Sequence, residues 1–178
     1  MPLVEAPSRA KRLVEHGDTI LATVRPNLRS FLYIKNPPKN MVVSTGFAVL
    51  HPSSKIDARF LYYTVTNQRF TDYLSANVKG AAYPAVDTET FARAEIWLPY
   101  LQVQQEIAAV LSAYDDIIEN NLRRIKILEE MAQSLYQEWF VKFRFPGYQK
   151  VKMVHSPIGQ IPEEWEIRQI GEVIETLG

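Results

Sequence analysis

The side chains best suited to catalysis or metal binding are spread along this chain without the spacing that such sites need. The three histidines, His16, His51 and His155, lie far apart, and there is no cysteine to supply a thiolate. Paired carboxylates occur at Asp115-Asp116 and Glu129-Glu130, but both pairs fall in a long helical stretch, where solvated faces routinely carry them. No Ser/His/Asp arrangement or phosphate-binding loop is present. The sequence favours binding over catalysis, with no metal and no cofactor held by the chain.

One short string resembles part of a base-modifying site. Asn36-Pro37-Pro38 matches the start of the Asn-Pro-Pro-aromatic tetrapeptide of DNA amino-methyltransferases, in which the aromatic ring stacks on a flipped base. The fourth residue here is Lys39, and no glycine-rich cofactor loop precedes the string. We interpret it as a turn. A stand-alone DNA methyltransferase is kept as a third hypothesis, which S-adenosylmethionine binding by the isolated chain would support.

Residues 1–99 are predicted to form a domain of short strands and helix. Runs rich in β-forming residues occur at 19–24, 31–34 and 47–50, with turn-forming residues between them. The apolar period becomes helical over 57–77, where Asp57 is the expected N-cap. Residues 94–98 alternate like a strand and end at Pro99.

Residues 101–142 contain no glycine or proline and predict one helix of about 60 Å. A seam of positions spaced alternately four and three apart runs along it: Ile107, Leu111, Tyr114, Ile118, Asn121, Ile125, Leu128, Ala132, Leu135 and Trp139. A polar seam residue such as Asn121 commonly fixes register and partner number. The alternative is a helix buried in a globular core, but this helix is too long for that, so we expect a coiled coil.

The remaining residues complete an expected α+β fold: a mixed domain, one long coiled-coil helix and a short C-terminal strand or helix segment. The predicted boundaries are 1–99 for the mixed domain, 100–144 for the helix, 145–160 for a linker and 161–178 for the last segment. Trp165 and Ile167 alternate as in a strand with one buried face.

Charge is divided unevenly although the net charge is zero. Residues 1–100 hold 12 Lys/Arg and 8 Asp/Glu, and residues 101–178 hold 8 Lys/Arg and 12 Asp/Glu. The basic half could face phosphates, although ordinary scatter could also produce so small a difference. No stretch reaches the roughly 20 apolar residues of a membrane span, and the N-terminus lacks a signal-peptide pattern. With no cysteine, these features fit a cytoplasmic protein.

Several strings in order resemble the central conserved region of type I restriction-modification specificity subunits. They are Ile96-Trp97-Leu98-Pro99, Gln104-Gln105-Glu106-Ile107-Ala108-Ala109-Val110-Leu111, Asp115-Asp116-Ile117-Ile118-Glu119-Asn120-Asn121, Leu128-Glu129-Glu130-Met131-Ala132-Gln133-Ser134-Leu135-Tyr136, Trp139-Phe140-Val141 and Gly159-Gln160-Ile161-Pro162-Glu163-Glu164-Trp165. Upstream, Lys11-Arg12, Gly17-Asp18-Thr19-Ile20, Thr23-Val24-Arg25-Pro26 and Ser44-Thr45-Gly46-Phe47 resemble a target recognition domain of that family. Each string is weak alone, but their order and spacing make the resemblance specific.

The resemblance implies sequence-specific recognition of double-stranded DNA without catalysis by this chain. In that family two recognition domains each read half of a split site, and two long antiparallel helices separate them. Modification subunits supply S-adenosylmethionine chemistry, and restriction subunits supply ATP- and Mg-dependent translocation and cleavage. This chain holds one recognition domain and one long helix, so it is expected to be half-length, and its domain lacks the usual opening strand.

The candidate DNA-binding residues are basic or amide side chains of the first half, of types that hold phosphates or read base edges: Lys11, Arg12, Arg25, Asn27, Arg29, Lys35, Lys39, Asn67, Gln68, Arg69 and Lys79. Arg25 and Asn27 suit guanine and adenine edges respectively. About half of the set should prove to be ordinary surface residues. The runner-up function is a coiled-coil scaffold that has lost DNA selectivity.

An assembly is predicted from the seam, because soluble monomers rarely expose so large an apolar stripe. An antiparallel homodimer would cover it and would place two identical recognition domains for a split palindrome. We also expect the C-terminal segment to add a strand to the partner's recognition domain. A disordered tail is the alternative to this exchange.

Overall fold

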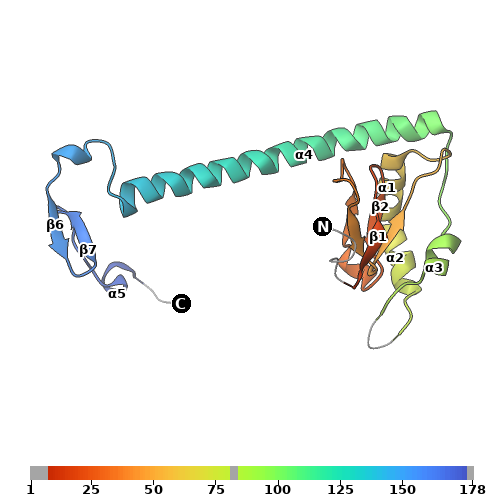
Figure 1. Ribbon diagram of the computed structural model, residues 1–178, viewed down its shortest axis with the longest axis horizontal. Helices are drawn as coiled ribbons and strands as arrows, with labels where there is room; N and C mark the ends of the chain where they lie inside the picture. The colour runs from red at the N-terminus through yellow and green to blue at the C-terminus, as the bar shows by residue number, and fades with distance from the viewer. Residues whose placement is uncertain (1–7, 81–83, 176–178) are drawn as a thin grey trace. The chain divides into compact units, whose positions relative to one another are not determined.

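The computed structural model describes residues 8–80 and 84–175. The chain forms two compact units, Met1–Ile117 and Ile118–Gly178, and helix α4 (Leu101–Tyr136) runs from the first into the second (Figure 1). Strands and helices are mixed in the first unit, and the second adds a hairpin and a short helix. The α+β fold expected from the sequence is confirmed.

The first unit is built on two small antiparallel sheets. β2 (Thr19–Ala22) pairs with both β3 (Phe31–Tyr33) and β5 (Phe47–Leu50), so the strand order is β3-β2-β5. Ile20 lies opposite Leu32 on one side and Val49 on the other. β1 (Ala10–Leu13) pairs with β4 (Val42–Ser44) in a second sheet. The three predicted strand runs are confirmed, whereas β1 and β4 were not predicted.

Alternation along β2 divides the core of the first unit. Neighbouring side chains of a strand point to opposite faces, and Ile20 packs with Val14 and Ile34, whereas Leu21 packs against the helices. The helical side of this core also contains Leu61, Val65, Phe70, Leu74 and Val86. Residues four apart share a helix face, which explains why Leu61 and Val65, and then Phe70 and Leu74, are buried together.

The helix predicted over 57–77 is two helices. Asp57 caps α1 (Ala58–Thr66) by accepting hydrogen bonds from the backbone N–H groups of Arg59 and Phe60, as expected. Asn67 then takes an extended conformation and caps α2 (Gln68–Ala76) through the N–H of Phe70. The apolar period continues across this break, so periodicity alone did not reveal it.

Of two further predictions for the first unit, one is wrong and one is confirmed. Residues 94–98 are not a strand: they form an extended segment between α3 (Thr88–Arg93) and α4 that pairs with no described strand. The turn at Asn36-Pro37-Pro38 is confirmed, because Asn36 has a left-handed φ of 49° and the N–H of Met41 donates to the carbonyl of Pro38 at 3.1 Å.

Helix α4 confirms the long helix predicted from the seam, and its 36 residues correspond to about 54 Å. Its first turns belong to the first unit, where Gln104 and Ala108 are buried. A π-helical turn, η3 (Gln137–Val141), follows it directly. The seam side chains remain largely exposed, among them Ile118 at 57% and Ile125 at 51%.

The second unit departs from the predicted linker and lone strand. β6 (Met153–Ser156) and β7 (Gly159–Pro162) form an antiparallel hairpin within residues 145–162, most of which the sequence assigned to a linker. Trp165 and Ile167 lie outside any strand, before α5 (Ile170–Val173). Trp165 instead contacts the rings of Phe140 and Phe143 at centroid distances of 6.0 and 5.4 Å.

Candidate nucleic-acid interface

The loop between β2 and β3 is held in an uncommon backbone conformation. It contains the short 3-10 helix η2 (Pro26–Leu28), which Arg25 and Arg29 flank with left-handed φ angles of 49° and 54°. Such conformations cost a non-glycine residue on the order of 1 kcal/mol or more, and they persist where the surroundings hold them. Pro26 is buried, and the N–H of Arg25 donates to the carbonyl of Pro84 at 3.0 Å. The loop is therefore rigidly presented.

Arg29 anchors this loop to the helices. Its guanidinium donates to the backbone carbonyl of Thr66 at 2.8 Å and to the side-chain oxygen of Gln68. The same group lies 5.6 Å from the centre of the Phe31 ring. Gln68 in turn donates to Asp72 at 2.7 Å. Arg29 and Gln68 are thus brought together, and their polar groups already have protein partners.

Four candidates are exposed and make no side-chain hydrogen bond or ion pair with any described residue: Lys11, Arg25, Asn27 and Lys39. Arg25 and Asn27 are two residues apart on the rigid loop, so their donor groups project from one short segment. Lys11 lies on β1 and Lys39 in the turn before β4. These four are the residues best able to offer their polar groups to a ligand.

The other candidates have partners within the first unit. Arg12 donates to the carbonyl of Phe47, and Lys35 lies 3.7 Å from the carboxylate of Asp116 on α4. Asn67 serves as the helix cap described above, and Lys79 pairs with Asp87. The expectation that about half of the set serves the protein itself stays a prediction, because a residue with an internal partner can still contact DNA.

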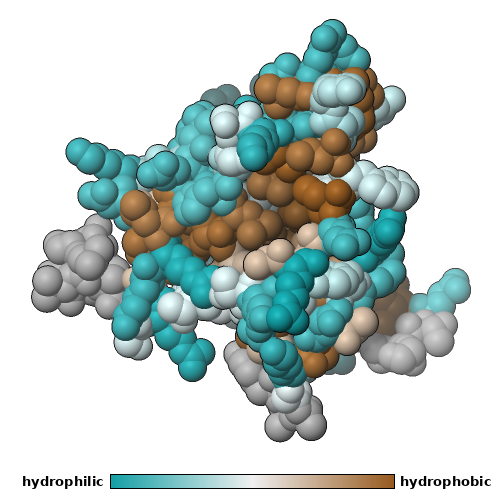
Figure 2. All heavy atoms as spheres, turned by 90° about the vertical axis from the view of Figure 1, so that its right-hand side faces the viewer, coloured by the Kyte–Doolittle hydropathy of each residue, from teal (hydrophilic) through white to brown (hydrophobic). Residues whose placement is uncertain are grey.

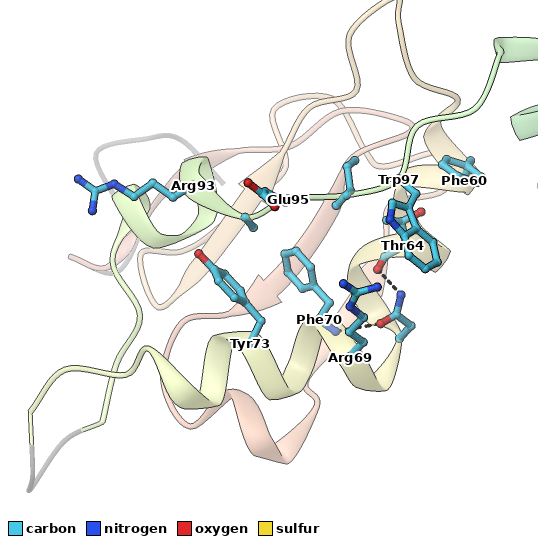
Figure 3. A pocket seen from close by; sticks show the side chains of 11 residues that line it. Phe60, Thr64, Arg69, Phe70, Tyr73, Arg93, Glu95 and Trp97 are labelled. Atoms are coloured by element: carbon cyan, nitrogen blue, oxygen red, sulfur yellow. Dashed lines mark hydrogen bonds between the residues drawn. The ribbon is translucent and has the colours of Figure 1, made fainter.

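Arg69 lines a hollow of about 720 Å³ between α1, α2 and the extended segment 94–97. Its guanidinium lies 4.8 Å from the centre of the Trp97 ring, and Phe70 and Tyr73 point from α2 toward the segment that carries Glu95 (Figure 3). Figure 2 shows apolar residues gathered at the centre of the viewed face, with hydrophilic residues around them. The hollow can receive an apolar or aromatic group.

The pKa values of Tyr63 and Asp87 are shifted by their surroundings in the first unit. Burial raises the pKa of Tyr63 well above its ordinary value, and the hydrogen bond that its hydroxyl donates to Asp115 adds to this. The Lys79 ammonium holds the pKa of Asp87 well below its usual range, and hydrogen bonds from Thr90 act in the same direction. Both groups keep their ordinary charge near neutral pH, Tyr63 neutral and Asp87 negative.

Sequence reasoning missed the residues that join the domain to α4. Gln104 is 1% exposed and Tyr63 makes the hydrogen bond to Asp115, yet neither was a candidate. The position of Gln104, one turn into a predicted helix, was the only feature of the sequence that could have pointed to its role. Among the described residues no group of three or more His, Cys, Asp or Glu side chains could hold a metal ion. No helix in the described part of the chain is long and apolar enough to cross a membrane.

The first unit is thus an α+β domain that presents a short loop with exposed basic and amide side chains, and comparison with known sequences identifies its family. Residues 5–130 match the family described as the type I restriction modification DNA specificity domain. The chain belongs to this family.

The chain is also similar to individual proteins of known name. The chain is 30% identical over 159 residues to the type I restriction enzyme MjaIX specificity subunit of Methanocaldococcus jannaschii, covering 88% of this chain and 36% of that protein. It is also 30% identical over 142 residues to the HindI specificity subunit of Haemophilus influenzae, covering 78% and 31%. The chain therefore spans about a third of the length of these relatives.

Solved structures show the same architecture. The HsdS subunit from Thermoanaerobacter tengcongensis matches with a TM-score of 0.57 and 27% identity, over 76% of this chain and 35% of that one. A chain from a structural study of complex assembly and conformational transition of the type I R-M system matches over 95% of this chain and 41% of that one. Its TM-score is 0.53 and its identity 25%.

Proposed function

We propose that this chain recognises a specific DNA sequence as part of a type I restriction-modification assembly and catalyses no reaction itself. The observation that carries the proposal is the rigid loop that presents Arg25 and Asn27 without protein partners. Arginine reads guanine O6 and N7 in two hydrogen bonds, and asparagine reads adenine N6 and N7 in the same manner. Lys11 and Lys39 would contact phosphates, which position a protein without reading sequence.

The remaining parts of the proposal concern partners. Modification subunits would supply S-adenosylmethionine chemistry, and restriction subunits would use ATP and Mg²⁺, all bound outside this chain. The DNA that it reads would lie in the cytoplasm. The relatives named above are specificity subunits, which supports this division of labour.

Selection from a randomised duplex pool tests the proposal. The full chain, co-purified with a modification subunit, should enrich a defined sequence, and Arg25→Ala should change or remove that enrichment. A scaffold without selectivity would assemble and enrich nothing, which is the result that would overturn the proposal. The pairing of Arg29, Gln68, Lys35 and Lys79 with protein groups is the observation that favours a scaffold.

We further propose that two copies pair through the seam of α4 in antiparallel orientation. Leu111, Ile118 and Ile125 are 39%, 57% and 51% exposed, and burying such side chains contributes on the order of 1.5–3 kcal/mol for each one fully covered. A second copy offers a complementary stripe of the same length. Light scattering at micromolar concentration should give a dimer, and a monomer would reject this arrangement.

Within this dimer, we further propose that the two copies exchange their C-terminal segments. The pairing of β7 with β6 gives that segment a partner of its own, which weakens the argument from a lone strand. Ile170 and Val173 are 71% and 64% exposed and could still pack on another chain. Deleting the residues after Gly159 removes most of β7 and should lower the melting temperature in either case, whereas it should weaken dimerisation only if the segment is exchanged. Unchanged dimerisation would favour a tail.

A further inference from the structure

Gln104 is a buried polar side chain of α4 that makes three hydrogen bonds to the backbone of the first unit. Its amide oxygen accepts from the N–H of Asp57 at 2.9 Å, and its amide nitrogen donates to the carbonyls of Pro99 at 2.8 Å and Lys55 at 3.3 Å. Asp57 is the N-cap of α1, and Pro99 ends the segment that enters α4. With 1% exposure, Gln104 cannot replace these bonds with water. It fixes where α4 leaves the domain.

A second set of contacts lies three turns further along α4. The hydroxyl of Tyr63 donates to Asp115 at 2.5 Å, and Lys35 pairs with Asp116. Gln104, Ala108 and Asp115 lie at spacings of four and seven, so they share one helix face. At about 100° per residue, this face overlaps the beginning of the seam, because Gln104 precedes the seam residue Leu111 by seven positions and Asp115 follows it by four. The helix therefore docks on its own domain through its first turns, and later seam residues such as Ile118 and Ile125 remain exposed.

The angle between the recognition domain and α4 affects DNA binding, because each added base pair both lengthens and rotates the duplex. One base pair adds about 3.4 Å along the duplex and turns it by about 34°. Two recognition domains joined through a pair of stiff helices can match two half-sites at one spacing only if each domain is held at a fixed angle to its helix. The contacts that fix that angle lie within the first unit, at Gln104 and at Tyr63 with Asp115.

We propose that Gln104 and the Tyr63–Asp115 pair are positioning residues that set the number of base pairs between the two half-sites. This inference rests on the proposed function. It assigns spacer selectivity to the joint between domain and helix, while base selectivity stays with the loop of Arg25 and Asn27. Loosening the joint should then widen the accepted spacing without changing the bases that are read.

The test uses the full chain with a modification subunit and the half-sites that the wild-type protein enriches. Duplexes keep these half-sites and vary the spacer by one base pair at a time. Gln104→Met keeps a similar side-chain volume and removes the three hydrogen bonds. Tyr63→Phe removes only one hydroxyl. Tyr73→Phe is the matched control, because its hydroxyl donates to the carbonyl of Thr90 at 3.0 Å, away from α4.

We expect wild-type affinity to fall about tenfold or more when the spacer changes by one base pair, comparable to the cost of a mismatched pair. For Gln104→Met and Tyr63→Phe we expect a fall of about threefold or less, with the same bases enriched by each. Tyr73→Phe should behave as wild type. Melting curves identify a variant that fails to fold, and Tyr63→Phe keeps the test valid if Gln104→Met does so.

Each contrary outcome has a distinct meaning. A spacing optimum that stays sharp in both folded variants would overturn this inference and leave the proposed function intact. A loss of binding at every spacing by folded variants would also overturn it, because the residues would then serve recognition itself. A wild-type chain that enriches no sequence would overturn the inference together with the proposed function. A wild-type chain that enriches only an undivided site would overturn the inference alone.

Discussion

Two arginines four residues apart in one loop have different surroundings. The Arg29 guanidinium holds the carbonyl of Thr66 and the side chain of Gln68, whereas that of Arg25 has no partner among the described residues. Both lie in left-handed backbone conformations. The sequence predicted both as DNA contacts because residue type alone cannot distinguish an anchor from a reader. The distinction needs the positions of α1 and α2, which are remote in sequence.

Replacing each arginine separately should distinguish the anchor from the reader. Arg25→Ala should weaken binding to the enriched DNA by about 1–3 kcal/mol, the value of one bidentate base contact, and leave the melting temperature unchanged. Arg29→Ala should lower the melting temperature, because it removes two hydrogen bonds that tie the loop to the helices. Fluorescence anisotropy and thermal denaturation measure the two effects. Normal DNA binding by Arg25→Ala would contradict its role as a reader.

The cap of α1 was predicted from the sequence and has a measurable energy. Asp57 accepts from the N–H groups of Arg59 and Phe60, both at 2.9 Å. Asp57→Ala should therefore lower the free energy of unfolding by about 1 kcal/mol, as seen for other helix caps. Glu129→Ala, which changes an exposed carboxylate of α4 that caps no helix, is the control, and urea denaturation should show a change within about 0.5 kcal/mol. Equal effects of the two changes would argue against capping.

Acid should weaken the contact between Lys79 and Asp87. The pKa of Asp87 is lower in the folded chain than in the unfolded one, because Lys79 and Thr90 donate to its carboxylate. The resulting stabilisation is present above the ordinary carboxyl pKa of about 4 and is lost as the pH falls below it. The difference in melting temperature between wild type and Asp87→Asn should begin to narrow near pH 4 and continue to narrow as the pH falls toward the lower pKa of the folded chain. A difference that stayed constant between pH 6 and pH 3 would contradict this assignment.

At the scale of elements, local pattern predicted long features well and short ones poorly. The seam spacing over 101–142 identified α4, because a repeated period over many turns is hard to obtain by chance. Four-residue β1 and three-residue β4 carry too little pattern, and their pairing joins residues about thirty apart. The break at Asn67 was missed because its cap geometry does not disturb the apolar period.

Residues 94–98 and Trp165 show why alternation can mislead. In the first case Trp97 is 81% exposed and pairs with Arg69, so its apolar character serves a side-chain contact and no sheet. In the second, Trp165 packs on Phe140 and Phe143. A segment with alternating apolar residues forms a strand only where a neighbouring strand is present to pair with it. The sequence of the segment alone does not show whether such a neighbour is present.

The seam of α4 allows a matched test of pairing. Ile125→Asp should dissociate the proposed dimer, because an interface would bury an unpaired carboxylate. Gln133→Asp introduces the same charge on the same helix but outside the seam, and it should leave the dimer intact. Analytical ultracentrifugation measures both, and circular dichroism checks that each helix remains. If Ile125→Asp sedimented like wild type, the seam would not be the interface.

At the scale of the whole molecule, symmetry links assembly to the DNA that is read. One chain carries one recognition domain in its first unit and spans about a third of its curated relatives. A two-fold dimer would present two identical reading surfaces in opposite orientation. Identical surfaces related in this way read the same bases on opposite strands. The assembly therefore restricts the class of site before any base contact is known.

The proposed dimer predicts that the enriched DNA is an inverted repeat interrupted by a spacer of undefined sequence. Sequencing the selected pool measures this directly, since the two halves should be reverse complements and change together in any variant of the loop. Arg25→Ala should thus relax the same position in both halves, because one substitution alters both copies. Ile125→Asp, which removes the dimer but keeps the loop, should enrich at most one half-site with weaker affinity. Two unrelated half-sites in the wild-type pool would show that the second reading surface is not a copy of this chain.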